Sequence, residues 1–124
     1  MTDTDAPPAN FHLHSLRYTG GSLMVTLEVG GEPHVELQFD PPRAFRSYSE
    51  SDFHHYLATY RGEPLLKGRD ADVGVFMSDD APYVVEYRTN VRPSEPETTF
   101  SCLIATPQEC VEVVCFEKPA IRFL

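Results

Sequence analysis

Hydrophobic and polar residues alternate along two segments near the start of the chain. Every second residue is Leu, Val or Phe over residues 23–29 and again over residues 35–39. This period of two places the apolar side chains on one face of a half-buried β-strand. Gly30-Gly31 separates the two segments, and paired glycines suit a tight turn between antiparallel strands. The pattern predicts a β-hairpin that ends at Asp40-Pro41-Pro42, because proline cannot donate to a strand ladder.

A helical period follows, after residues 44–48, which we expect to be extended. The apolar positions i, i+3, i+4 and i+7 are occupied by Phe53, Tyr56, Leu57 and Tyr60. Residues 49–52 read Ser-Glu-Ser-Asp, so either serine can cap the helix, and Ser49 with Asp52 has the spacing of a loose capping box. Gly62 predicts the end of the helix.

The middle of the chain has a less regular pattern. Residues 65–72 are predicted to form a charged connection, and residues 73–78 a strand. Residues 82–87 alternate as a strand would, but Ser78 as a cap, acids in the first turn and an early proline also describe a two-turn helix, which we favour. Residues 91–98 contain prolines and glutamates and are predicted to form an exposed loop.

Two nearly continuous apolar segments, residues 100–105 and 111–116, come next. Such runs are typical of central strands, here covered by a helix on one face and at least partly on the other. If residues 107–110 form the turn between them, Cys102 lies opposite Cys115. We favour three free thiols, because free cysteine commonly behaves as a small buried hydrophobe, while a redox pair stays open as an alternative.

Together these elements predict an α+β fold, a mostly antiparallel twisted sheet of five or six strands with one or two short helices packed on one face. The chain has 124 residues and a mass of 14.0 kDa, which fits one domain. Residues 1–10 contain acids and prolines with little apolar material, so we expect a disordered tail. Residues 11–124 would then form the single domain, with the apolar residues of 118–124 packed against it.

The charge balance is strongly acidic. Nineteen acidic residues against ten basic ones give a net charge of −9, with an isoelectric point near 4.8. This sign disfavours nucleic acid and anionic lipid surfaces as partners and favours a cationic one. The sequence also has no apolar run of membrane-spanning length and no signal peptide at its start, so we expect a cytoplasmic protein.

Motifs for catalysis, metal binding or nucleotide binding are missing from the sequence. The histidine pairs at 12/14 and 54/55 could hold zinc only by long-range convergence, since neither HExxH nor CxxC occurs. No serine lies in a GxSxG context, and the glycines never form GxGxxG or GxxxxGK. We therefore expect no cofactor and no metal, and an enzyme is less favoured than a binding protein.

The distribution of acids suggests where a partner would bind. Between Glu63 and Glu112 there are ten carboxylates and four basic residues, most of them in predicted loops. Such a surface can steer a basic protein toward it, although acidity for solubility alone is the simpler alternative. The predicted partner-binding acids are Asp70, Asp72, Asp79, Asp80, Glu95 and Glu97.

Three segments together resemble small acidic β-rich bacterial proteins, among them immunity proteins that neutralise toxins and others of unknown function. They are the hairpin ending in Leu37-Gln38-Phe39, the segment from Phe45 to Phe53 that leads into the short helix, and the final pair of strands up to Pro119. The resemblance spans about residues 20–124. It implies a non-catalytic protein whose acidic loops cover the basic active site of a nuclease-type toxin.

Two other hypotheses remain. A small-ligand-binding or enzymatic domain would place its site between the sheet and the helix, lined by Tyr56, Tyr60 and histidines. Homodimerisation through an exposed strand edge is compatible with either function, because unpaired edges invite pairing.

Overall fold

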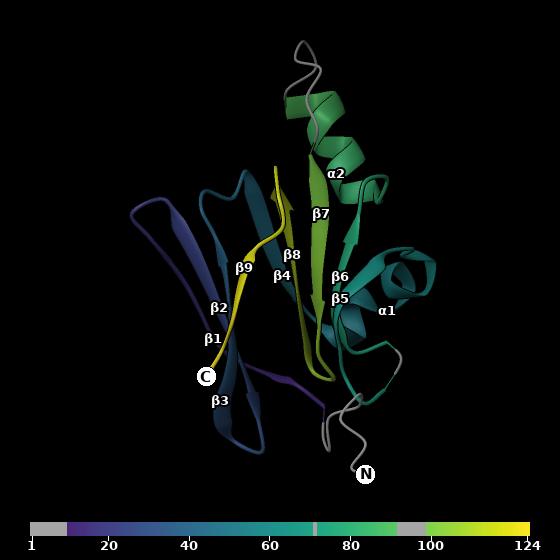
Figure 1. Cartoon of the computed structure of the whole chain (residues 1–124). Coiled ribbons are helices and arrows are strands. Elements are labelled where there is room, and N and C mark those ends of the chain that lie inside the picture. Colours follow the sequence, from purple (N-terminus) through teal and green to yellow (C-terminus); the bar gives the residue numbers. More distant parts are fainter. Residues whose placement is uncertain (1–9, 71, 92–98) are drawn as a thin grey trace.

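The computed structural model describes residues 10–70, 72–91 and 99–124. Within them the chain forms nine strands in two antiparallel sheets and three short helices, so the α+β class is confirmed. The expected single sheet of five or six strands was wrong in arrangement, since one sheet has four strands and the other has five. Figure 1 shows the two sheets side by side, with the helices on the far side of the five-stranded sheet.

The four-stranded sheet has the order β1-β2-β3-β9. Its strands are β1 (His12–Thr19), β2 (Ser22–Val29), β3 (Glu32–Phe39) and β9 (Ala120–Phe123). The predicted hairpin is β2 and β3, and its Gly30 and Gly31 have φ of 62° and 84°, which the preferred two-residue hairpin turn requires. Leu27 lies opposite Val35, and Leu23 opposite Phe39, so both strands turn their apolar residues to one face.

The five-stranded sheet has the order β4-β8-β7-β6-β5. Its strands are β4 (Ala44–Ser49), β8 (Glu109–Cys115), β7 (Phe100–Ala105), β6 (Gly74–Ser78) and β5 (Glu63–Lys67). Strand β5 replaces the beginning of the connection expected over residues 65–72. It is a short edge strand interrupted by Pro64 and a register shift next to it, so its sequence lacks a clear period of two.

The main core lies between the two sheets. Leu23, Val25 and Leu37 from one sheet pack with Ile104 and Val113 from the other, and all five are almost completely buried. The central strands β7 and β8 are buried on both faces, as their continuous apolar runs predicted. Their second face is covered by helices, which gives this protein three layers.

The helices are α1 (Glu50–Thr59), α2 (Pro82–Glu86) and the π-helical turn η1 (Tyr87–Val91). Helix α1 packs Tyr56 and Leu57 onto β7 and β8, together with Tyr60, which follows the helix. Ser49 is the N-cap residue of α1, but its hydroxyl donates to the Asp52 carboxylate at 2.9 Å and accepts no hydrogen bond from the helix backbone. The favoured helix after β6 is confirmed as α2, which is capped by Ala81 and not by Ser78.

Gly62 has a different role from the one its sequence position predicted. Helix α1 ends at Thr59 with Tyr60 as the extended C-cap residue, so Gly62 lies beyond the cap. A Cβ atom at Gly62 would lie 2.7 Å from Tyr60 Cε1 and 2.8 Å from the carbonyl oxygen of Met77. Glycine is required here because the chain passes close to β6, and not because it terminates a helix.

The turn between β7 and β8 sets a different register from the one expected for a turn over residues 107–110. Thr106 accepts a hydrogen bond at Oγ1 from the Glu109 amide, and its own amide donates to the Glu109 carbonyl at 3.0 Å. This tight turn moves the pairing by two residues, so that Cys102 lies opposite Val113 and Cys115 opposite Phe100. All three cysteines are free and buried.

Both ends of the described chain differ somewhat from expectation. Asn10, expected in a disordered tail, is buried and exchanges two hydrogen bonds with Asp70, at 2.7 and 2.9 Å. The rest of that expected tail lies outside the described residues. Of the loop expected over residues 91–98, Val91 is the last residue of η1, and residues 92–98 lie outside the described residues. The packed C-terminal segment is confirmed for the backbone of β9, which pairs with β3, but the Phe123 and Leu124 side chains are largely exposed.

Candidate functional site

A hollow of about 770 Å³ opens at the α2 end of the five-stranded sheet, and we call it the end groove. It is lined by residues 61–65, residues 77–80, Phe100 and residues 116–118. The first two segments belong to the ends of β5 and β6, and the last is the connection that leads from β8 to β9 in the other sheet. The end groove therefore lies where the chain crosses between the two sheets.

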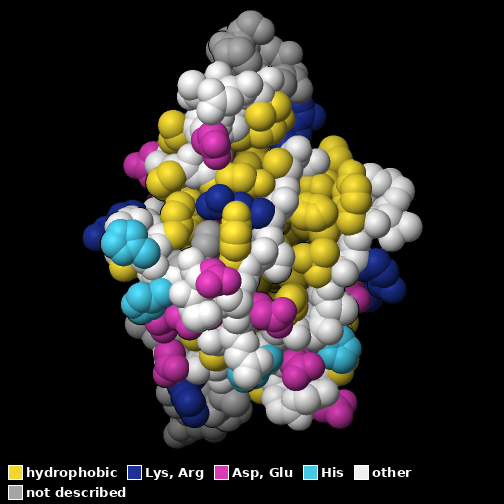
Figure 2. All heavy atoms as spheres, turned by 180° about the vertical axis from the view of Figure 1, so that it is seen from behind, with side chains coloured by type: hydrophobic (Ala, Val, Ile, Leu, Met, Phe, Trp, Pro, Cys, Tyr) yellow, Lys and Arg dark blue, Asp and Glu magenta, His cyan; other side chains and the backbone are white. Residues whose placement is uncertain are grey.

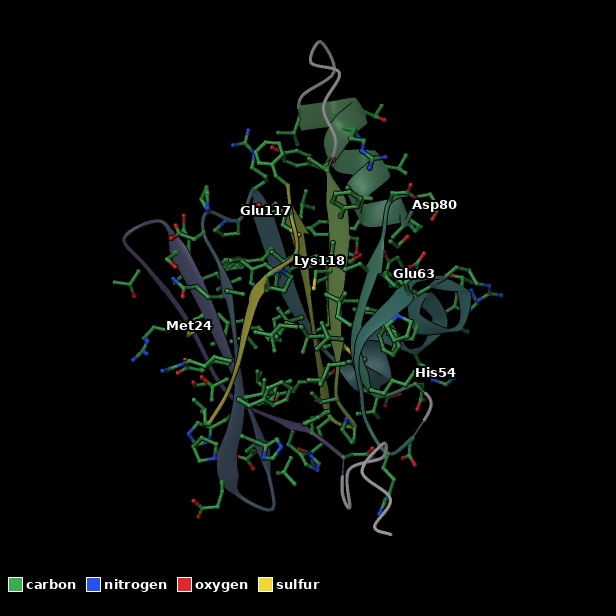
Figure 3. All side chains as sticks on the ribbon, in the orientation of Figure 1. Met24, His54, Glu63, Asp80, Glu117 and Lys118 are labelled. Carbon is green, nitrogen blue, oxygen red and sulfur yellow. The ribbon has the colours of Figure 1, made fainter. Side chains whose placement is uncertain are left out.

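The end groove combines an apolar interior with an acidic rim. Leu65, Met77 and Phe100 are partly buried and pack against the main core, so they form its base. Four exposed acids surround this base, and they are Glu63, Asp79, Asp80 and Glu117. Figure 3 shows Glu63 and Asp80 on the β5–β6 side and Glu117 on the side of the β8–β9 connection.

Two basic residues, Arg61 and Lys118, also line the end groove. The Arg61 guanidinium donates to the carbonyls of Ala58 and Tyr60 at the end of α1, at 3.4 and 3.3 Å. Lys118 has no ion-pair partner among residues 10–70, 72–91 and 99–124. Four acids against two bases leave this groove with a negative balance.

The structure separates the acids that the sequence grouped together. Asp79 and Asp80 lie at the end groove, where Asp80 accepts a hydrogen bond from Ser78 Oγ at 2.9 Å. Asp70 and Asp72 lie in the turn at the opposite end of the β5–β6 hairpin. Glu95 and Glu97 lie outside the described residues. The predicted partner-binding acids did not include Glu63, which was among the ten counted carboxylates, or Glu117, which lies beyond the counted stretch. Both line the end groove together with Asp79 and Asp80.

Glu112, one of the ten carboxylates counted toward the acidic surface, is instead fully buried. It lies opposite Arg46 on β4, and Arg46 Nη2 donates to its Oε1 at 2.9 Å. Its Oε2 accepts hydrogen bonds from Tyr56 on α1 at 2.8 Å and from Ser101 on β7 at 2.5 Å. The Tyr60 hydroxyl lies 2.9 Å from Ser101 Oγ and completes the network. One carboxylate thus joins three strands and a helix.

Aromatic rings surround the Arg46 side of this network. The guanidinium carbon lies 4.0, 5.1 and 5.3 Å from the ring centres of Tyr83, Tyr56 and Tyr48. Burial lowers the pKa of Arg46, but the hydrogen bond and charge of Glu112 outweigh burial and raise it above its usual value. Burial and Glu112 likewise raise the pKa of the Tyr56 hydroxyl. Both oxygens of the Glu112 carboxylate accept hydrogen bonds within the fold, and raised pKa values keep Arg46 and Tyr56 protonated near neutral pH, which suits a structural role.

Tyr56 and Tyr60, proposed above as lining a ligand site, therefore serve to dock α1 on the sheet. The histidines expected beside them lie elsewhere. His54 is exposed on α1, 3.6 Å from Glu50, and His14 pairs with Glu28 at 2.9 Å on the four-stranded sheet. In the described part of the chain, no three His, Cys, Asp or Glu side chains are grouped so that they could hold a metal ion.

The cysteines are poorly placed for nucleophilic chemistry. Burial raises the pKa of the Cys110 thiol to about 11 and that of Cys115 to about 12. Burial raises the pKa of Cys102 as well. Because the thiolate is the reactive form, all three side chains are inert thiols near neutral pH.

The opposite side of the molecule has a different surface. Figure 2 shows hydrophobic side chains gathered over the upper half of that face, with acidic side chains spread singly around and below them.

The edge strands of the two sheets are β1, β9, β4 and β5. Strands β1 and β5 contain register shifts, and β9 has four residues, features that hinder pairing with another chain.

Comparison of the chain with protein families, with curated proteins and with solved structures gave no match. None of the helices described here is long and apolar enough to cross a membrane.

Proposed function

We propose that this chain is a non-catalytic binding protein for a basic protein partner. The observation that carries the proposal is the convergence of Glu63, Asp79, Asp80 and Glu117 around one open groove. These acids come from three separate parts of the chain, and opposite charge across an interface mainly increases association rate and selectivity. The net charge of −9 adds attraction over longer distances.

The more specific form of the proposal is an immunity protein that neutralises a nuclease-type bacterial toxin in the cytoplasm. A nuclease binds phosphates through basic side chains, so a compact acidic protein can cover its active site by the same electrostatics. The resemblance of about residues 20–124 to small acidic β-rich bacterial proteins, some of which are immunity proteins, supports this form. The Arg46–Glu112 network and the buried thiols support binding over catalysis, because the strongest candidate groups are engaged in the fold.

The experiment is co-purification with the tagged full chain from its native lysate at low and at high salt. A basic protein recovered in one-to-one ratio at low salt, and released at high salt, is the expected result. The purified partner is then assayed for nuclease activity, which one equivalent of this protein should abolish. A partner that is acidic, or whose nuclease activity is unaffected, would overturn the toxin-inhibitor form of the proposal.

A small ligand is the competing occupant of the end groove. Its volume of about 770 Å³ lies within the range of small-molecule sites. Native mass spectrometry of the purified chain separates the two functions, since a retained small molecule of constant mass would favour the ligand-binding alternative. The chain at its sequence mass, together with a salt-sensitive basic partner, would favour the protein-binding function.

A further inference from the structure

We propose that the end groove recognises a short segment of the partner that carries a long cationic side chain, lysine or arginine, next to apolar residues. The inference rests on the proposed function, because it names the part of a basic partner that this site takes. Three observations support it: the apolar base of the groove, its acidic rim and its volume of about 770 Å³.

The two parts of the groove match the two parts of a lysine or arginine side chain. Such side chains lay an aliphatic stem along apolar surface and keep the charged head at its margin. Leu65, Met77 and Phe100 offer the apolar surface, and Phe116 adds a partly exposed ring. A volume of about 770 Å³ is more than one side chain fills, so a segment of several residues fits better than a single anchor.

Recognition in this groove would occur through side chains and not through strand addition. Strand β5 borders the groove and is the outer strand of its sheet. Pro64 has no backbone N–H to offer, and the register shift between Pro64 and Leu66 disrupts the regular edge. An added strand would therefore find few consecutive partners on β5, whereas the side chains around the groove are accessible.

The effect expected for Lys118 is opposite to that of the acids in the groove. Lys118 lines the groove together with the four acids, so an incoming cation meets repulsion from a resident one. Removing Lys118 should strengthen binding of a cationic segment, while removing the charges of Asp79 and Asp80 should weaken it. If the protein attracted cations only through its overall negative charge, the same substitution would change binding by a similar amount wherever it is made.

The experiment uses the full chain and a synthetic tetralysine peptide as the probe, with a tetrapeptide of acetylated lysines as its uncharged counterpart. Acetylation keeps the aliphatic stem and removes the charge. Binding is followed by isothermal titration calorimetry and by amide chemical shifts in NMR. We expect tetralysine to shift amides of residues 61–65, 77–80 and 116–118, and the acetylated peptide to bind far more weakly.

The two aspartate variants form a matched pair, because each raises the net charge by two. Asp79→Asn/Asp80→Asn is expected to weaken tetralysine binding about fivefold, from two exposed ion pairs. Asp70→Asn/Asp72→Asn removes the same charge at the other end of the hairpin and should change it less than about twofold. Lys118→Met should strengthen it about twofold or more. Asparagine keeps an acceptor for Ser78 and for Asn10, so both double variants should retain the fold.

Equal weakening by the two aspartate pairs, or shifts spread over other surfaces, would overturn the groove assignment. The same variants applied to the captured partner separate this inference from the proposed function. If Asp79→Asn/Asp80→Asn leaves partner binding intact, the groove inference fails while the proposed function stands. If tetralysine binds in the groove and no basic partner exists, the site stands and the proposed function fails.

Discussion

Replacing Arg46 with methionine would leave the Glu112 carboxylate fully buried without its cation. Removing one partner of a buried ion pair costs about 3–5 kcal/mol. Arg46 is 25% exposed, and Tyr56 and Ser101 would still donate to Glu112 Oε2. We therefore expect the lower end, a loss of about 3 kcal/mol in the free energy of unfolding. For a chain of this length, that loss lowers the melting temperature by roughly 10 °C.

Urea unfolding followed by far-ultraviolet circular dichroism measures this loss, since the sequence contains no tryptophan to report by fluorescence. The matched control is Arg122→Met, which removes an ion pair of similar geometry, 2.6 Å from Glu36, from an exposed position. We expect a loss of at most about 0.5 kcal/mol there. A double variant, Arg46→Met/Glu112→Gln, should be more stable than the sum of the single effects predicts, because both charges are removed together.

Equal losses for Arg46→Met and Arg122→Met would refute this reasoning. That result would mean that the hydroxyl donors and local solvent compensate the buried carboxylate without help from the guanidinium. The aromatic contacts of Arg46 with Tyr83 and Tyr56 would then have to contribute little as well. The cycle therefore tests whether burial or geometry decides the strength of an ion pair in this protein.

The remaining predictions concern packing and thiols. Gly62→Ala should lower the free energy of unfolding by about 1–3 kcal/mol, because its Cβ meets the Met77 carbonyl at 2.8 Å; an unchanged urea midpoint would contradict this. Native protein at pH 8 should react slowly with a thiol reagent at all three cysteines and quickly once unfolded in urea. Because burial raises the pKa of Cys110 to about 11 and of Cys115 to about 12, unfolded thiols ionise first, so stability should fall as the pH rises above about 8.5 toward these values. Unfolding free energies measured at pH 7.5 and 9.5 check the sign, and a rise would contradict it.

Local periodicity allowed much of the fold to be predicted. The alternation over residues 23–39 and the paired glycines specify β2 and β3, because each strand buries one face only. The continuous apolar runs of β7 and β8 indicated strands buried on both faces. The alternating pattern of β2 and β3 thus indicated a sheet with one exposed face, and the continuous runs of β7 and β8 indicated a sheet covered on both faces. The division into two sheets depends on long-range pairing, such as β9 with β3, which no local pattern specifies.

The candidate site was harder to predict, because its parts come together only in the folded chain. Glu112 is the single acid within the apolar segment 111–116, and Arg46 is a single base within a short extended segment. An isolated charge within an apolar run can indicate a buried ion pair. By this criterion, Glu112 does not belong among the ten carboxylates that were counted as an acidic surface. Glu63 and Glu117 are 54 positions apart and meet at the end groove through strand pairing, which charge counting cannot detect.

Strand β9 has a consequence for how the protein is assembled during synthesis. Strands β1 to β3 form a meander that is complete early, but the free edge of β3 is covered only by residues 120–123. All five strands of the other sheet are synthesised in between, which takes seconds to tens of seconds at usual translation rates. During that interval the β3 edge and its apolar face are open to neighbouring chains. In the folded chain, residues 120–123 pair with this edge, which no other strand covers, and an uncovered strand edge can pair with another chain.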